Sequence, residues 1–342
     1  KTLRDALGNR FSGVFDRMGA HTPRQDVINA AKEASRLKAD LIVTFGGGSV
    51  TDGAKAVGLC LGNNIHTPEG MNILRARSDT NGKPILSNFN GPAVRQISIP
   101  TTLSAGEFSD KAGVTDERSN TKEIYTHPDI IPQSVVLDPE PTLHTPEWLF
   151  LSTGVRAVDH CVEGFCSHES NAYGDALALH GLSLLTRGLP RVKAEPNNLS
   201  ARLDCQMGAW MSMGPLASGV PMGASHGIGY ILGAGFDIPH GHTSCIMLPA
   251  VMRWNNSVNS DRQDRVSVAM GKIKGEKSES AADRLDAFIA DLGMPRSLSA
   301  VNIGPEHFAL ISEQALNTPW VPRNPRSVTG SDQIMEILEL AA

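Results

Sequence analysis

The chain has 342 residues and a formal charge of −5, and this length is enough for two domains. Its lysines and arginines form no basic stripe, which argues against a nucleic-acid partner. No apolar run approaches the length of a membrane span. Five cysteines without paired spacing are typical of free thiols in a reducing compartment, so we expect a cytoplasmic protein.

The first 140 residues alternate short apolar runs with helical patterns. The run D-L-I-V-T-F at 40–45 predicts a strand of a parallel sheet that is covered on both faces. This alternation predicts an α/β domain with a doubly wound parallel sheet and flanking helices. Further strands are expected at 13–15, 95–100 and 134–137, a hairpin at 113–115 with 122–125, and helices at 24–37 and 52–61.

From about Thr145 the pattern becomes helical and strand signals nearly vanish. Helices are expected at 148–167, 172–189, 199–213 and 281–292. The sequence therefore predicts an α/β domain over 1–140 and an all-α domain over 141–342.

Two segments of the first half carry possible ligand contacts. G-G-G-S at 46–49 follows an apolar strand and precedes a helix, as in a cradle for a diphosphate at a helix N-terminus. The alternative is a purely structural turn, because the segment matches neither GxGxxG nor a Walker loop. Thr101 and Thr102 follow a later strand and either face the same ligand or form a simple turn.

Histidines gather in an apolar part of the second half. His160 lies inside an apolar helical pattern, where a lone histidine is usually a core residue. His226 and His240 are fourteen residues apart, with Gly233 in the turn between, which allows both to converge on His160. His242 is either a fourth polar group or solvated. The set predicts a buried site for a metal or for proton transfer.

Motifs along nearly the whole chain resemble the iron-containing alcohol dehydrogenase family, including its maleylacetate reductase branch. They are G-G-G-S at 46–49 with Asp52, P-T-T at 100–102, T-D-E at 115–117, Lys122, L-D-P at 137–139, T-G-V-R-A-V-D-H-C-V-E at 153–163 and I-P-H-G at 238–241. The resemblance implies a dehydroquinate synthase-like fold, an N-terminal dinucleotide-binding domain, a helical C-terminal domain and an active-site cleft between them. It also implies a homodimer acting on a small molecule.

The resemblance assigns roles to particular residues. It implies NAD(H) or NADP(H) at Gly46, Gly47, Gly48, Ser49, Asp52, Thr101, Thr102 and Lys122. The family begins with a strand and loop that this chain lacks, so contacts that choose NAD over NADP are expected upstream. The family metal site uses one Asp and three His, of which His160, His226 and His240 match.

Two positions depart from the family pattern. Arg156 stands at the Asp position, and a guanidinium about 5 Å from a divalent ion repels it by roughly 6 kcal/mol at an effective dielectric near 20. Asp159 replaces that carboxylate poorly, because it points about 100° around the helix from His160. Tyr230 stands where family alcohol dehydrogenases carry a further histidine. We therefore expect that neither Fe nor Zn binds tightly at this site.

The first hypothesis is a nicotinamide-dependent reductase of a C=C or C=O bond that works without a metal. Arg156 then holds a substrate carboxylate, while His160, His226 and His240 bind oxygens and donate a proton, with Tyr230 and His242 as second candidates. A surface salt bridge from Arg156 to Asp159 or Glu163 is the structural alternative. Two further hypotheses are an Fe- or Zn-dependent alcohol dehydrogenase and a degenerate nucleotide-binding protein without turnover.

Overall fold

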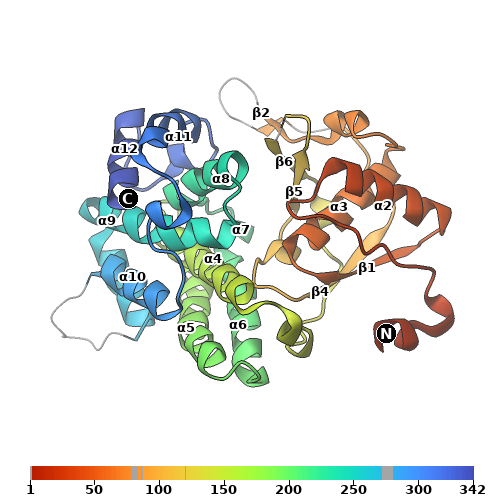
Figure 1. Ribbon diagram of the computed structural model, residues 1–342, viewed down its shortest axis with the longest axis horizontal. Coiled ribbons are helices and arrows are strands. Elements are labelled where there is room, and N and C mark those ends of the chain that lie inside the picture. The colour runs from red at the N-terminus through yellow and green to blue at the C-terminus, as the bar shows by residue number, and fades with distance from the viewer. Residues whose placement is uncertain (1, 79–83, 86–87, 120, 272–279) are drawn as a thin grey trace. The chain divides into compact units, whose positions relative to one another are not determined.

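The computed structural model describes residues 2–78, 84–85, 88–119, 121–271 and 280–342 (Figure 1). Backbone contacts divide the chain into two compact units, residues 1–100 with 106–136 and residues 101–105 with 137–342. Strands and helices alternate in the first unit, whereas the described residues of the second unit form helices and no strand. The predicted α/β domain followed by a helical domain is confirmed.

A parallel sheet organises the first unit. Its strands β1 (Leu41–Gly46), β4 (Arg95–Pro100) and β7 (Ser134–Val135) lie in the order β1-β4-β7. The register pairs Gly46 with Pro100, so β1 and β4 end at the same edge of the sheet. Helix α3 (Gly48–Gly62) packs on β1 and β4 and starts two residues after β1 ends.

Two expectations for this unit are wrong. Residues 13–15 form no strand, and Val14 is 69% exposed. Strand β1 is not covered on both faces, because Leu41 and Phe45 are 41% and 52% exposed while Thr44 is buried. The strand lies at an edge of the described sheet, where one flank has no neighbour. An apolar run alone does not distinguish an edge strand from a central one.

The rest of the first unit packs around α3. Helix α2 (Arg24–Arg36) lies against α3, and the antiparallel hairpin of β5 (Lys111–Asp116) and β6 (Thr121–Thr126) contacts it through β5. Val27, Leu59 and Tyr125 are fully buried in the core of this unit. The remaining regular elements are α1 (Thr2–Leu7), β2 (Arg77–Ser78) and β3 (Pro84–Ile85).

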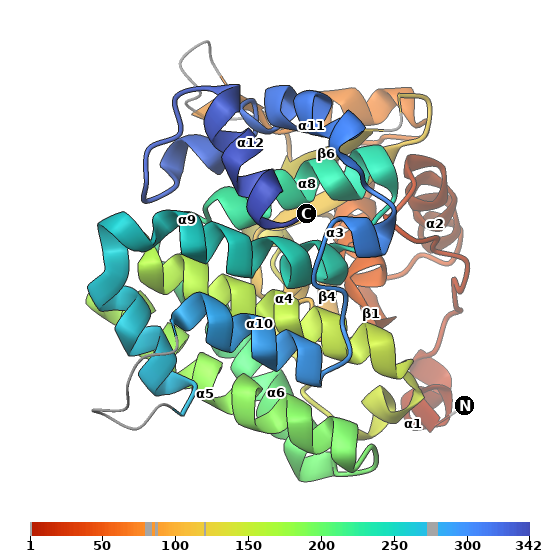
Figure 2. The same ribbon diagram turned by 60° about the vertical axis from the view of Figure 1, so that its left-hand side comes forward.

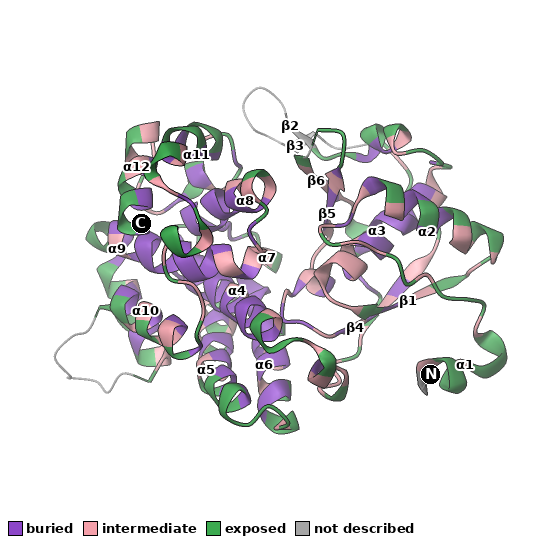
Figure 3. Cartoon of the chain, viewed as in Figure 1, coloured by how far each residue is buried: buried purple, intermediate pink, exposed green. Residues whose placement is uncertain are grey.

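The second unit is built around α4 (Glu147–Cys166), which is buried along most of its length (Figures 2 and 3). A helix that is buried on all sides lies in the middle of a domain, and its charged residues Asp159 and Glu163 are buried with it. Helices α5, α6 and α9 pack against α4. The other helices of the unit are α5 (Ala172–Ala194), α6 (Leu199–Ser212), α7 (Gly214–Ala217), α8 (Ala224–Phe236), α9 (His240–Ala269, kinked at Asn259), α10 (Ala281–Asp291), α11 (Phe308–Ala315) and α12 (Ser331–Leu340).

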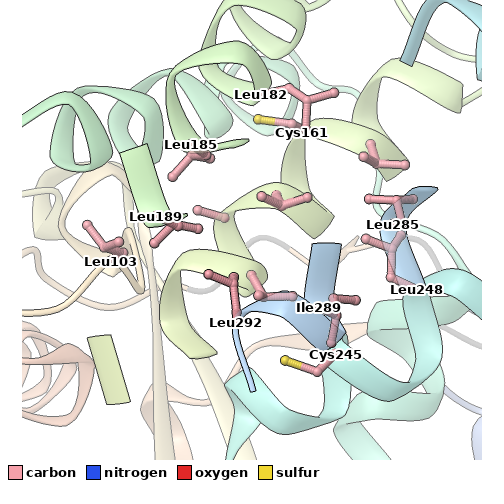
Figure 4. Close-up of a cluster of buried hydrophobic side chains, with 14 of the residues drawn as sticks. Leu103, Cys161, Leu182, Leu185, Leu189, Cys245, Leu248, Leu285, Ile289 and Leu292 are labelled. Atoms are coloured by element: carbon pink, nitrogen blue, oxygen red, sulfur yellow. The ribbon is translucent and has the colours of Figure 1, made fainter. Parts of the chain in front are cut away.

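Two apolar clusters stabilise the second unit. The first joins α4, α5, α9 and α10, and Leu185, Leu248 and Ile289 are fully buried in it (Figure 4). The second joins α8, α9, α11 and α12. Together they fix α8 and α9 beside α4, and these three helices carry all of the predicted histidines.

All five cysteines are buried free thiols, as expected. Among the residues that the structure describes, no helix has the length and apolar character of a membrane span.

Candidate functional site

Arg156 is the only residue from Phe150 to Cys166 of α4 that is half-buried, whereas the others are buried. Its Nη1 donates a hydrogen bond to Oγ of Ser244 on α9 over 3.1 Å. A Cβ added to Gly229 on α8 would lie 3.8 Å from the same Nη1. The guanidinium therefore lies where α4, α8 and α9 meet, and it forms no ion pair with a described carboxylate. The expected alternative of a surface salt bridge to Asp159 or Glu163 is wrong.

Glu163 binds the beginning of α8, one turn along α4 from Asp159. Its Oε1 accepts a backbone N–H from Ser225 at 2.8 Å, and its Oε2 accepts those of Gly223 at 3.0 Å and His226 at 3.3 Å. The same Oε2 lies 2.7 Å from Nδ1 of His226. A carboxylate at a helix N-terminus is stabilised by unpaired N–H groups and by the helix dipole. Glu163 thus fixes both the helix start and the imidazole of His226.

Asp159 is fully buried and faces the same histidine. Its Oδ2 accepts hydrogen bonds from the hydroxyls of Ser225, at 2.9 Å, and Ser244, at 2.6 Å. It also lies 3.4 Å from Nδ1 of His226. Ser244 therefore accepts from Arg156 and donates to Asp159, which links the cation to the carboxylate through one hydroxyl.

The four predicted histidines take part in three ring contacts. The ring centroids of His160 and His226 are 4.9 Å apart, and Nδ1 of His160 lies 3.4 Å from Oγ of Ser212. The rings of His240 and Tyr230 are 6.0 Å apart. His242 contacts Trp148, with centroids 5.6 Å apart.

A close approach of backbones positions His240 and His242 next to α4. A Cβ at Gly241 would lie 2.6 Å from the backbone carbonyl carbon of Ser152, so only glycine fits between these two histidines. The start of α9 therefore rests directly on α4, near the turn that carries Arg156.

Burial controls protonation in this cluster. It lowers the pKa of His226 to about 3, with the positive charge of Arg156 acting in the same direction. It also lowers the pKa of His160 well below its usual range, assisted by His226 and Arg156. Burial raises the pKa of Asp159 to about 6, and it raises that of Glu163 against three backbone N–H donors. Both imidazoles are therefore neutral at pH 7.

Asp159, Glu163 and His226 form a buried group able to hold a metal ion. Each offers one ligand atom, and these atoms lie within 4.8 Å of one another. Oδ1 of Asp159 and Nε2 of His226 are buried and have no hydrogen-bond partner among the described residues. The sequence led us to expect no tightly bound metal, because Arg156 stands at the family Asp position. This buried group leaves that expectation without support. Asp159 was expected to replace the family carboxylate poorly because it points around the helix from His160. Its carboxylate nevertheless faces His226.

In the first unit, the glycine turn has the predicted form. Strand β1 ends at Gly46, Gly47 is the N-cap, and α3 begins at Gly48, so the first N–H groups of α3 lie at the strand end. Ser49 has a structural contact: its Oγ accepts the backbone N–H of His21 at 3.1 Å.

Asp52 and Lys122 meet at the hairpin. Oδ2 of Asp52 accepts the backbone N–H of Gly113 at 2.9 Å. A Cβ at Gly113 would lie 2.4 Å from Cε of Lys122 and 3.6 Å from Oδ2 of Asp52, so glycine makes room for the lysine beside the carboxylate. The structure thus brings together two of the predicted cofactor residues.

Thr101 and Thr102 belong to the second unit. The carbonyl of Thr101 accepts a hydrogen bond from the Thr145 hydroxyl at 2.7 Å, and Oγ1 of Thr102 lies 3.1 Å from Oγ of Ser104. Their assignment to the cofactor stays a prediction.

Sequence reasoning missed Glu163, Ser212, Ser225 and Ser244 as site residues. Serine and glutamate carry no spacing signal of their own. The one available hint for Glu163 was its position on the buried helix of His160, where a carboxylate requires partners.

Comparison with known proteins identifies the family. A family model described as iron-containing alcohol dehydrogenase matches residues 1–139, and the C-terminal model of the same family matches residues 150–342. The chain therefore belongs to the iron-containing alcohol dehydrogenase family, and it is an NAD(P)-dependent oxidoreductase.

Individual relatives agree with this family. The chain is 35% identical to Dehydrogenase FUM7 of Gibberella moniliformis, covering 99% of this chain and 86% of the relative. It is 31% identical to a maleylacetate reductase of Burkholderia cepacia, covering 98% and 83%. The crystal structure of maleylacetate reductase from Agrobacterium tumefaciens matches with a TM-score of 0.80 and 27% identity, covering 99% and 85%.

Proposed function

We propose that this oxidoreductase uses NADH or NADPH to reduce a C=C or C=O bond of a small substrate that bears a carboxylate, as a maleylacetate reductase does. The observation that carries the proposal is Arg156, a partly accessible guanidinium that forms one hydrogen bond, to Ser244, and no ion pair with a described carboxylate. A guanidinium has five N–H donors in a planar fork that fits a carboxylate.

The charges around Arg156 support this role. Asp159 and Glu163 lie on the same helix but direct their oxygens to serine hydroxyls, backbone N–H groups and His226. Neither carboxylate forms an ion pair with Arg156, so the cation remains available for an anionic ligand. Similarity to maleylacetate reductases at about 30% identity supports an acidic substrate without identifying it.

A second candidate is an Fe- or Zn-dependent alcohol dehydrogenase, which the buried group of Asp159, Glu163 and His226 favours. These three residues would hold the ion, and Oδ1 of Asp159 and Nε2 of His226 are buried atoms without a hydrogen-bond partner among the described residues. When bound, such an ion supplies a Lewis acid for a substrate oxygen.

Oxidation of NADH and NADPH over a panel of aldehydes, ketones and oxo-acids tests the proposal. Each substrate is assayed with and without added Fe²⁺ or Zn²⁺, and the metal content of protein purified without chelators is measured. The proposal expects oxo-acids to be turned over with kcat/KM well above that of matched aldehydes. Turnover confined to neutral aldehydes and dependent on stoichiometric metal contradicts it and supports the second candidate.

We further propose a homodimer located in the cytoplasm, as family resemblance and five buried free thiols suggest. Size-exclusion chromatography with light scattering tests the dimer.

A further inference from the structure

A cavity of about 190 Å³ lies in the second unit, and none of the candidate site residues lines it. It is bounded by the first turns of α4, the end of α5 and the beginning of α6. Its volume is many times the roughly 10–15 Å³ that one water requires, and it is smaller than the roughly 300 Å³ pockets that hold drug-sized ligands. The cavity therefore has room for one small molecule.

Arg202 supplies a buried positive charge at this cavity. The residue is 4% exposed, and its Cζ lies 4.6 Å from the ring centroid of Phe150. Nε donates to the carbonyl of Pro196 at 2.7 Å, and Nη1 donates to the carbonyl and the hydroxyl of Thr142 at 2.9 and 3.1 Å. These contacts fix the plane of the guanidinium at the wall of the cavity.

One nitrogen of this guanidinium is left for a ligand. Nη2 of Arg202 forms no hydrogen bond with a described residue, and no described carboxylate forms an ion pair with Arg202. The oxygens that bind Nε and Nη1 are neutral, so they leave the positive charge without a counter-ion. A buried charge without a counter-ion is costly, and an anion at Nη2 would lower that cost.

The other polar groups that line the cavity accept hydrogen bonds. Glu147 is exposed and is the second charged residue among the described lining residues. The Thr145 hydroxyl donates its proton to the carbonyl of Thr101 at 2.7 Å, so Oγ1 of Thr145 can only accept from a ligand. Burial lowers the pKa of Arg202 and the charge of Glu147 acts against it, yet the two form no ion pair. Their charged groups are therefore more than about 4 Å apart, which leaves space between them for a ligand.

The rest of the lining is apolar and includes Leu143, Leu151 and Val192, of which the last two are buried. We propose that this cavity is a second binding site, which takes a free amino acid with a small apolar side chain. The carboxylate of the ligand binds Nη2 of Arg202, its ammonium group binds Glu147, and its side chain contacts the apolar wall. The proposal does not depend on the substrate proposed above.

Calorimetric titration of the full chain with L-valine, isovalerate and isobutylamine tests the two polar contacts separately. Isovalerate lacks the ammonium group and isobutylamine lacks the carboxylate, while both keep the branched apolar part. We expect isovalerate to bind about fivefold more weakly than valine, because an exposed ion pair contributes little, and we expect isobutylamine not to bind. Failure of both carboxylates to bind, or binding of isobutylamine as tight as that of valine, overturns the proposal.

Variants assign the binding to the cavity. Glu147→Gln should weaken valine binding about fivefold and leave isovalerate unchanged, whereas Arg202→Met should weaken both about 30-fold or more. Leu143→Trp fills the cavity without removing a charge and should abolish binding. Glu140→Gln and Arg191→Met are matched controls, because both side chains are exposed and neither lines the cavity.

The result does not depend on the most severe of these variants. If Arg202→Met fails to fold, Glu147→Gln and Leu143→Trp still decide the question, because neither change removes a hydrogen bond of Arg202. Affinities for valine and isovalerate that stay unchanged in both variants contradict the proposal.

A final comparison separates this cavity from the site around Arg156. Because Arg156 is itself proposed to hold a carboxylate, valine is also titrated into Arg156→Leu and into wild type saturated with NADH. We expect the wild-type affinity for valine in both. Loss of binding in Arg156→Leu assigns the ligand to Arg156, and competition with NADH assigns it to the cofactor site. Either result overturns the second binding site without contradicting the proposed function.

Discussion

Nη1 of Arg156 donates to Oγ of Ser244 over 3.1 Å, and the same hydroxyl donates to Oδ2 of Asp159 over 2.6 Å. One serine thus separates the cation from the nearest carboxylate and keeps them from forming an ion pair. A directly paired arginine would have its charge compensated within the protein. This arrangement leaves the guanidinium to a ligand.

Removal of that hydroxyl should weaken substrate binding without abolishing turnover. In Ser244→Ala, Arg156 loses a hydrogen bond worth about 1 kcal/mol and is free to rotate, so KM for an acidic substrate should rise roughly fivefold. Steady-state kinetics check this, with Ser170→Ala as a control outside the cluster. An unchanged KM would show that Ser244 does not position the guanidinium.

Restoring a carboxylate at position 156 should favour a metal. Arg156→Asp removes the repulsion of about 6 kcal/mol expected for a guanidinium about 5 Å from a divalent ion, and adds an oxygen ligand one turn from His160. We expect Zn²⁺ affinity to rise at least tenfold, measured by competition with a chelator. Arg187→Asp, on the exposed face of α5, is the matched control and should leave the affinity unchanged.

Lys55 should stabilise the first unit through the 3-10 turn η3 (Gly106–Phe108) and the residues that follow it. Its buried Nζ donates to the carbonyls of Gly106, Ser109 and Lys111 at 2.6, 2.8 and 2.7 Å. Lys55→Met leaves these carbonyls unsatisfied and should cost about 2–4 kcal/mol. Urea denaturation followed by a probe in the first unit measures this, and exposed Lys32→Met should change stability by less than about 0.5 kcal/mol.

Glu107 should make stability depend on pH. Burial raises its pKa to about 7, against a usual value of about 4.3 for the unfolded chain. The folded state therefore binds the proton more tightly, and the free energy of unfolding falls as pH rises from about 4.3 to 7. Glu107→Gln should flatten this part of the profile, and exposed Glu313→Gln should not. A profile that rises with pH in the wild type and is unchanged in Glu107→Gln would refute this.

Local patterns predicted most of the fold, because periodicity and turn residues are local properties. The strand Arg95–Pro100 has the expected bounds, and α4 starts and ends within one residue of them. The exposure of Leu41 and Phe45 was mispredicted, because an edge position depends on neighbouring strands that the run itself does not specify. Side-chain partners were hardest to predict: Glu163 and His226 are 63 residues apart, and His160 and Ser212 are 52 apart.

The central claim is that Arg156 holds a substrate carboxylate, and a comparison of two matched substrates tests it most directly. The measurement is kcat/KM for an oxo-acid and for its neutral methyl ester, in wild type and in Arg156→Leu, with the KM for NADH as internal control. The loss of a charge-assisted pair predicts that kcat/KM for the acid falls about 100-fold while the ester and NADH change little. An equal fall for acid and ester, or no fall for either, would contradict the claim.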